Sequence, residues 1–224
     1  MANEWSSVIR TAEDYRNPRI TSNIYLHFST LSEDIYKYAK YAKGDLLDIG
    51  AGLSPYRSFF KNVNKYIRMD NFQYLGAKKP DIIGDALDIP LKANSIDSVF
   101  SSQVLEHVKD PKKMVNEIHR ILKKDGVCIL TTHMAQVLHG EPHDYFRFTE
   151  YGLKELFKKF SHVEIKPNGG ALLAIFQLFI FAIDEKFPVI SKPIIIFLNF
   201  IIKKLDKIFF DKRFTINYLV YAIK

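Results

Sequence analysis

The sequence contains a single cysteine, Cys128, among its 224 residues. Because a disulfide joins two cysteines, the chain has no disulfide framework of its own, and we expect it to work in a reducing compartment, the cytoplasm. The N-terminal residues, Met-Ala-Asn-Glu-Trp, are polar and aromatic and lack the basic and then apolar pattern of a secretory signal. We therefore expect no targeting segment at the start of the sequence.

Long apolar runs are also lacking. Residues 171–183 are apolar except for Gln177, charged residues follow at 184–186, and a second apolar stretch at 194–210 carries polar residues along one helical face. Neither stretch reaches the roughly 20 residues that a membrane-spanning helix requires. The apolar surface of this segment must still be buried against another surface. We interpret 171–210 as a hydrophobic helical segment that packs onto the domain, forms a homodimer or makes peripheral contact with a membrane.

The basic composition has no recognisable nucleic-acid signature. A net charge of +7 is compatible with an acidic partner such as nucleic acid, anionic lipid or a phosphorylated substrate. Much of the lysine is scattered through predicted helices, however, and no RNA-binding module is recognisable, so we expect no nucleic-acid partner. With 47% hydrophobic residues the chain can bury a sizeable core, and its length fits a single domain, 1–224.

Glycine is sparse, with 10 residues, but two of them fall together at Gly50 and Gly52. They follow the apolar run Leu-Leu-Asp-Ile, which predicts a buried strand entering a glycine turn, where backbone N–H groups meet a ligand at the carboxyl edge of a sheet. Asp48 interrupts the apolar run. A buried acid needs a partner, so we expect Asp48 to face the ligand edge. A second predicted strand ends at Asp70, where such folds bind ribose hydroxyls.

A third glycine, which a dinucleotide-binding loop needs, is missing after Gly52, so the nicotinamide fingerprint is incomplete. The loop instead resembles that of the class I S-adenosylmethionine-dependent methyltransferases, in particular their small-molecule, type 11 branch. The resemblance is most specific over 95–132. There a strand leads into Leu-Glu-His at 105–107, then a helix, a Lys-Lys-Asp-Gly turn and another strand. A nicotinamide-dependent reductase would not explain this block.

The resemblance implies S-adenosylmethionine as the cofactor. In the family the glycine loop lies against the methionine part, the acid after the second strand binds the ribose, and residues after the third strand lie at the adenine end. On these grounds the expected cofactor-binding residues are Asp48, Gly50, Ala51, Gly52, Asp70, Asn71, Asp85, Ala86, Ser101 and Gln103.

The resemblance also implies the fold: α/β, with a Rossmann-like, doubly wound sheet of seven mostly parallel strands, the last strand antiparallel. An N-terminal helical lead-in occupies 1–43, and 171–210 becomes a helical insertion before the final strand. Ser32 and Thr149 are the expected helix caps. We expect strands at 46–49, 66–70, 81–86, 95–102, 127–132, 163–166 and 215–223, and helices at 31–43, from 56–61 onward, at 114–122 and at 150–160.

Histidines are the candidate catalytic residues. Methyl transfer from a sulfonium requires alignment of the acceptor and exclusion of water. If the acceptor is a hydroxyl or an amine, a base must remove a proton, and histidine suits this role. The candidates are His107 after the fourth strand, His133 after the fifth, and His143 in the next loop. Each could equally be a helix cap or a hydrogen-bonded core histidine.

The segment 133–147 combines histidine, acidic, tyrosine and arginine residues. Loops at the carboxyl ends of parallel strands carry the substrate side of such sites, so we expect Tyr145 and Arg147 to contact the substrate. A structural salt bridge from Arg147 to Asp144 or Glu150 is the alternative. Histidines and carboxylates at irregular spacing, without a cysteine pair, are a weak zinc signal, and we expect no metal.

The apolar segment 171–210 favours a small methyl acceptor that is hydrophobic or linked to a lipid or a sugar, and we expect O-methylation rather than N- or C-methylation. Two alternatives belong to other classes. One is a non-catalytic or membrane-associated protein that binds the cofactor on the same fold, and the other is the nicotinamide-dependent reductase.

Overall fold

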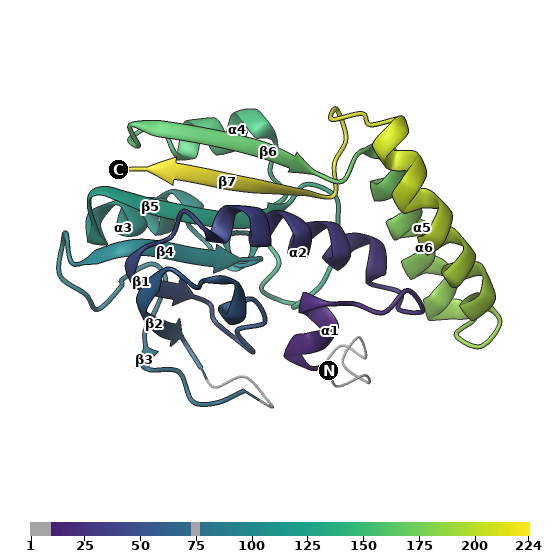
Figure 1. Ribbon diagram of the computed structural model, residues 1–224, viewed down its shortest axis with the longest axis horizontal. Helices are drawn as coiled ribbons and strands as arrows, with labels where there is room; N and C mark the ends of the chain where they lie inside the picture. Colours follow the sequence, from purple (N-terminus) through teal and green to yellow (C-terminus); the bar gives the residue numbers. More distant parts are fainter. Residues whose placement is uncertain (1–9, 73–76) are drawn as a thin grey trace.

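A seven-stranded sheet forms the centre of the computed structural model, which describes residues 10–72 and 77–224 (Figure 1). The strand order is β3-β2-β1-β4-β5-β7-β6, and β7 runs antiparallel to both of its neighbours, while β1 to β5 pair in parallel. This arrangement confirms the predicted fold class. The strands are β1 (Gly44–Ile49), β2 (Val63–Asp70), β3 (Ile82–Ile83), β4 (Ile96–Ser102), β5 (Leu122–His133), β6 (His162–Asn168) and β7 (Asn217–Ile223).

The central strands are buried on both faces, which explains their continuous apolar sequence. In β5, Cys128 is fully buried and pairs with Val99 of β4 on one side and Ala222 of β7 on the other. Ile49 at the end of β1 pairs with Ser101 near the end of β4. The loops that follow β1, β4 and β5 therefore leave the sheet at one edge, and this edge holds the candidate site.

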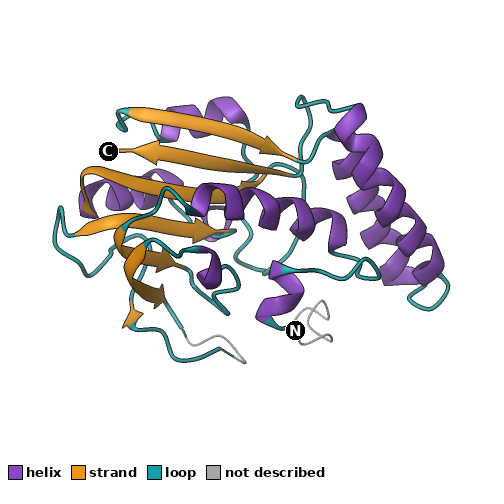
Figure 2. Cartoon of the chain, viewed as in Figure 1, coloured by secondary structure: helices purple, strands orange, loops and turns teal. Residues whose placement is uncertain are grey.

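Helices cover the two faces of the sheet (Figure 2). On one face, Leu31 and Ile35 of α2 (Tyr25–Ala39) pack in a buried cluster with Leu46 and Phe100. On the other face, α3 (Pro111–Ile121) and α4 (Glu150–Leu156) bury their apolar sides, including Ile118 of α3. Thr149 caps α4 as predicted, since its hydroxyl accepts a hydrogen bond from the Gly152 N–H at 3.1 Å.

The two remaining predicted helices differ most from the structure, whereas α3 begins three residues earlier than expected and α4 ends four residues earlier. The helix expected at 31–43 begins at Tyr25 and ends at Ala39, because its buried face extends upstream to Leu26. Ser32 therefore lies inside α2 and is not its cap; its hydroxyl donates to the Arg16 carbonyl oxygen at 2.5 Å.

The helix expected from residue 56 is a single 3-10 turn, η2 (Arg57–Phe59). The chain enters β2 soon afterwards, at Val63, which leaves no room for a longer helix. In the N-terminal lead-in, α1 (Ala12–Arg16) precedes α2, and residues 1–9 lie outside the described residues.

The segment 171–210 is helical, as predicted, and lies between β6 and β7 in the chain. Its helices α5 (Ala171–Lys186) and α6 (Ser191–Ile208) lie side by side beyond the sheet edge toward which β4 points (Figure 1). Their inner faces form a core that includes Leu26 of α2 and Ile216 before β7. Among the described residues, no helix combines the length and apolar character needed to cross a membrane.

Candidate active site

The glycine loop after β1 contains two residues in the left-handed region, Gly50 at φ 66° and Gly52 at φ 45°. A Cβ atom on Gly50 would lie 2.4 Å from Cγ2 of Val104, whereas a Cβ on Gly52 would meet nothing within 4 Å. The Gly50 N–H donates to the Met69 carbonyl oxygen at 2.9 Å and ties the loop to β2. Gly50 is therefore required for packing within the protein, and Gly52 borders open space.

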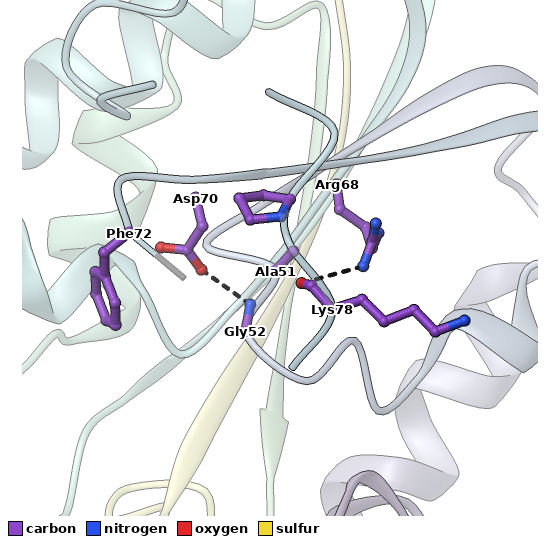
Figure 3. Close-up of a pocket in the computed structure, with 7 residues that line it drawn as sticks. Ala51, Gly52, Arg68, Asp70, Phe72 and Lys78 are labelled. Atoms are coloured by element: carbon purple, nitrogen blue, oxygen red, sulfur yellow. Dashed lines mark hydrogen bonds between the residues drawn. The ribbon is translucent and has the colours of Figure 1, made fainter. Parts of the chain in front are cut away.

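A pocket lies at this open space (Figure 3). The Asp70 carboxylate, at the end of β2, accepts hydrogen bonds from the N–H groups of Gly52 and Asn71, each at 2.9 Å. Phe72 lies at the rim with about half of its surface exposed. The structure thus brings together Gly52 and Asp70 as predicted. The residues that line the pocket are Ala51, Gly52, Arg68, Asp70, Phe72, Lys78 and Pro80.

Asp48 is buried within β1 and does not line this pocket. The Tyr66 hydroxyl donates a hydrogen bond to its carboxyl group at 2.7 Å. Burial, with a smaller contribution from the nearby Asp70, raises the pKa of Asp48 to about 7 against the opposing hydrogen bond from Tyr66. The partner that a buried acid requires is therefore a tyrosine on the next strand.

The remaining predicted cofactor residues lie near the carboxyl ends of β3 and β4. The Asp85 carboxylate accepts from the Leu87 N–H at 2.8 Å, and Ala86 packs against the core. The buried Ser101 hydroxyl donates to the Ile49 carbonyl oxygen at 3.1 Å. Gln103 has a left-handed backbone, φ 58°, and its Oε1 atom has no hydrogen-bond partner in the described chain. A role in cofactor binding stays a prediction for these four residues, as it does for Asp48, Gly50, Ala51, Gly52, Asp70 and Asn71.

A second polar cluster occupies the ends of β4 and β5. Glu106, in the 3-10 turn η3 (Leu105–His107), is fully buried, and its Oε2 atom accepts from the Thr132 hydroxyl at 2.8 Å. Its Oε1 atom lies 3.1 Å from Nε2 of His133, the last residue of β5. The ring of His139, from the loop after β5, lies 5.0 Å from the His133 ring, centroid to centroid.

Burial controls the protonation of this cluster. It raises the pKa of Glu106 to about 7 and lowers that of His133 well below its usual value. On the other side of His133 lies His27 of α2, with ring centroids 5.1 Å apart. Burial lowers the pKa of His27 to about 3. Both histidines are therefore neutral at pH 7.

His107 differs from these buried histidines because it is only partly buried. Its Nδ1 atom lies 2.6 Å from the carbonyl oxygen of His143. A carbonyl oxygen can only accept, so Nδ1 carries the hydrogen and Nε2 carries the lone pair in the neutral ring. The His143 ring itself bonds the Tyr145 hydroxyl through Nδ1 at 2.9 Å.

Arg147 has the structural role that the sequence left open. Its guanidinium donates to both oxygens of Asp144, at 2.6 and 2.8 Å, and to the carbonyl oxygens of Gln136, Val137 and Phe146. All five N–H groups are used. Burial alone would raise the pKa of Asp144, but the bonds from Arg147 and from the His139 N–H lower it below its usual value. Arg147 therefore fastens the loop after β5.

Comparison with known proteins decides the family. The family model described as "Methyltransferase domain" matches residues 47–130, which run from β1 to β5. An uncharacterized protein of Methanocaldococcus jannaschii is 30% identical over 174 residues, 75% of this chain and 73% of the relative. A crystal structure described as a SAM-dependent methyltransferase from Archaeoglobus fulgidus superimposes with a TM-score of 0.58 and 18% identity, covering 95% of this chain and 97% of that one. The chain belongs to the S-adenosylmethionine-dependent methyltransferases of class I fold.

A further relative of this methyltransferase is the malonyl-[acyl-carrier protein] O-methyltransferase of Laribacter hongkongensis. It is 26% identical over 95 residues, 42% of this chain and 31% of the relative. The family sets aside the nicotinamide-dependent reductase and confirms S-adenosylmethionine as the cofactor. The pocket fits this cofactor, because Gly52 borders open space and the Asp70 carboxylate keeps lone pairs beyond its two N–H bonds.

The polar cluster at the ends of β4 and β5 includes three residues that lie outside the predicted set: His27, Glu106 and His139. Glu106 lies within the Leu-Glu-His motif, in which the predicted catalytic residue is its neighbour His107. His139 lies in the histidine-rich segment but has no distinguishing spacing. His27 reaches the cluster only because α2 crosses the sheet edge, and no local sequence signal predicts that contact.

Proposed function

We propose that this methyltransferase methylates a hydroxyl group of a small acceptor that is hydrophobic or linked to a lipid or a sugar, with His107 as the general base. The observation that supports this proposal is the hydrogen bond from His107 Nδ1 to the His143 carbonyl oxygen, which leaves Nε2 able to accept a proton. His107 follows β4 at the sheet edge where the glycine loop begins. A base in this position removes the acceptor's proton as the new O–C bond forms.

When bound, S-adenosylmethionine supplies a methyl group activated by the positive charge on its sulfur. Gly52 and Ala51 would hold its methionine part, and Asp70 would accept hydrogen bonds from its ribose. Tyr145, with about a third of its surface exposed beside His143, would contact the acceptor. These residues orient the two reactants, which is the main requirement of an in-line displacement.

Calorimetric titration tests the cofactor half of the proposal. We expect S-adenosylhomocysteine to bind the wild type and NADH not to bind. Gly52→Val fills the open space and Asp70→Ala removes the ribose acceptor, so both changes should weaken binding at least tenfold. Asp45→Ala, at the opposite end of β1, is the matched control. Binding of NADH in place of S-adenosylhomocysteine would contradict the proposal.

Transfer of a tritiated methyl group tests the acceptor half. An alkyl phenol and octyl glucoside serve as hydrophobic probes that carry aromatic and sugar hydroxyls. Replacement of the base in His107→Gln should lower the transfer rate by about 10²- to 10⁴-fold while the affinity for S-adenosylhomocysteine is retained. His162→Gln, an exposed position on β6, is the control. Transfer to water-soluble amines alone would overturn the hydroxyl acceptor.

A second candidate function is peripheral membrane contact through α5 and α6, which would bring the enzyme to the cytoplasmic surface of a bilayer. Exposed lysines flank the apolar surface of this helical pair, including Lys186, Lys192 and Lys204. A positively charged surface would repel its own copy in a symmetric dimer but attracts anionic lipid, so membrane contact is favoured over homodimerisation. The exposed apolar residues are Ile175, Phe179, Phe187, Val189, Ile190, Ile194, Ile196, Phe197, Phe200, Ile208, Phe209 and Phe210.

Co-sedimentation with vesicles tests this contact. We expect the wild type to pellet with phosphatidylglycerol vesicles more than with neutral phosphatidylcholine vesicles. The triple change Val189→Ser, Ile190→Ser and Phe197→Ser should abolish pelleting. Ile83→Ser with Tyr151→Ser, exposed apolar residues elsewhere, is the control. Negligible pelleting of the wild type, or a dimer in light scattering that the triple change dissociates, would contradict membrane contact.

A further inference from the structure

The structure assigns a binding site for a divalent transition-metal ion of the Zn²⁺ class to Glu106, His133 and His139. One possible ligand atom from each of these side chains lies within 4.8 Å of the other two. Atoms that bind one ion at about 2.0 to 2.2 Å lie at most about 4.4 Å apart, so the three side chains would hold an ion after a small inward shift. The three residues come from η3, the end of β5 and the loop after β5, so their spacing in the sequence is irregular.

The hydrogen bonding of the two buried residues favours an ion between them. Glu106 is 0% exposed and His133 is 2% exposed. Glu106 Oε1 and His133 Nε2 lie 3.1 Å apart, but no hydrogen bond joins them, and within the described chain neither Glu106 Oε1 nor His133 Nδ1 has a hydrogen-bond partner. Buried polar atoms without partners are rare and costly. A metal ion would supply the missing partner of the carboxylate oxygen.

Outer contacts orient these side chains as they do around known metal ligands. The Thr132 hydroxyl holds the second oxygen of Glu106 at 2.8 Å. Nδ1 of His139 lies 3.1 Å from the Val137 carbonyl oxygen, so that nitrogen carries the hydrogen and Nε2 keeps its lone pair for a metal.

A second group of possible ligands, His107, His139 and Asp144, also lies within 4.8 Å, but its carboxylate is already used. Both oxygens of Asp144 accept from Arg147. The first group is therefore the site that we propose, since its carboxylate atom Glu106 Oε1 has no hydrogen-bond partner within the described chain.

The donor set indicates the kind of ion. Two imidazoles and one carboxylate suit Zn²⁺, Co²⁺ or Fe²⁺ better than Mg²⁺ or Ca²⁺, which prefer oxygen ligands. Three protein ligands leave a coordination position open, as in catalytic zinc sites. His139 is the partly exposed member of the group, with 28% of its side chain exposed, so a further ligand would reach this open position from the side of His139. An acceptor oxygen could occupy it. That role rests on the proposed function, whereas the ion site itself does not.

Metal titration of untagged, chelator-treated full-length protein tests the site. We expect calorimetry to show that one Zn²⁺ ion binds per chain. We expect bound Co²⁺ to give the visible absorption bands that are typical of an ion with few ligands. Glu106→Gln and His139→Ala should each weaken Zn²⁺ binding by at least 100-fold. His119→Ala and His162→Ala, histidines outside the cluster, should leave it unchanged.

The variants separate the possible results. His139→Ala removes a partly exposed side chain, so it should fold even where the buried Glu106→Gln does not; circular dichroism checks this. Absence of Zn²⁺ binding in the wild type, or binding that survives His139→Ala, would overturn the site. If Asp144→Asn abolishes Zn²⁺ binding and Glu106→Gln retains it, the ion lies in the second group. That result would also overturn the proposed site. Failure to bind S-adenosylhomocysteine with intact Zn²⁺ binding would count against the proposed function alone.

Discussion

At the scale of single residues, Gly50 and Gly52 share a left-handed backbone but differ in what an added side chain would meet. Alanine at either position lowers the free energy of unfolding by about 1–2 kcal/mol, because the left-handed φ is unfavourable for it. At Gly50 it also meets Val104, which adds about 1–3 kcal/mol of overpacking.

We therefore expect Gly50→Ala to lower the free energy of unfolding by about 2–5 kcal/mol and Gly52→Ala by about 1–2 kcal/mol. Among variants that fold, Gly52→Ala should lower the cofactor affinity more than Gly50→Ala does, because its added methyl group enters the pocket. Urea unfolding and calorimetry with S-adenosylhomocysteine measure the two quantities. Equal effects of both changes on stability would contradict the packing argument.

Asp48 makes stability depend on pH. In the folded protein its pKa is raised to about 7 by burial, so between pH 4 and 7 the folded state binds the proton more tightly than the unfolded state. Stability must then fall as pH rises through this window, by at most about 4 kcal/mol. Arg68 opposes this effect and Asp70 reinforces it.

Asp48→Asn removes the ionisation and keeps a group that can accept from Tyr66. We expect the wild type to lose stability relative to Asp48→Asn between pH 5 and pH 8, as measured by urea unfolding at both values. Asp45→Asn, on the same strand but only half-buried, should follow the wild type. A constant difference between wild type and Asp48→Asn across the window would show that the buried carboxyl does not titrate there.

At the scale of elements, α5 and α2 are joined through Gln177. Its side-chain oxygen accepts from the His27 N–H at 3.0 Å, its amide donates to the partly buried Asn23 carbonyl oxygen at 2.6 Å, and Gln177 itself is fully buried. Gln177→Leu leaves these two backbone groups unpaired. We expect a loss of about 2–4 kcal/mol in the free energy of unfolding.

Chemical unfolding of Gln177→Leu measures this loss, with Glu185→Gln on the exposed surface of α5 as the control. Wild-type stability in Gln177→Leu would mean that the helices dock without this bond. The contact also shows why deletion of 171–210 is a poor test of membrane binding. Removing the helical pair would release α2 and with it His27, which packs on His133.

The elements that could be predicted from the sequence are those with a strong local pattern. The buried strands are continuous apolar runs, and Thr149 precedes a clear helix. The start of α2 could not be located, because Ser32 resembles a cap while the apolar spacing continues upstream to Leu26. The single turn η2 was missed because the early start of β2 limits it, and that limit is not a property of residues 56–61 themselves.

At the scale of the whole molecule, binding of the cofactor product should stabilise the fold. S-Adenosylhomocysteine at 100 times its Kd contributes about 2.7 kcal/mol if it binds only the folded state. For a domain of this size we expect the Tm to rise by about 5–10 °C. A thermal melt with and without ligand measures the rise, and Gly52→Val at the same ligand concentration is the control. A Tm that does not change would contradict binding to the folded state.

The candidate site could be predicted only in part, for a reason that also belongs to the whole molecule. Gly52 and Asp70 were predictable because each follows its own strand and the two strands are neighbours. The cluster of Glu106, His133 and His139 joins three separate segments, and His27 adds a fourth from the N-terminal helix. The strand order and the crossing of α2 bring these residues together, so no single stretch of sequence contains the pattern.

The position of Cys128 has a practical consequence. The only thiol of the chain lies in the middle of the sheet, paired on both sides and fully buried. An alkylating reagent can reach it only when β5 separates from its neighbours, so the rate of labelling counts openings of the entire core. The labelling rate of Cys128 therefore reports on global unfolding, and any ligand that stabilises the native state should lower that rate.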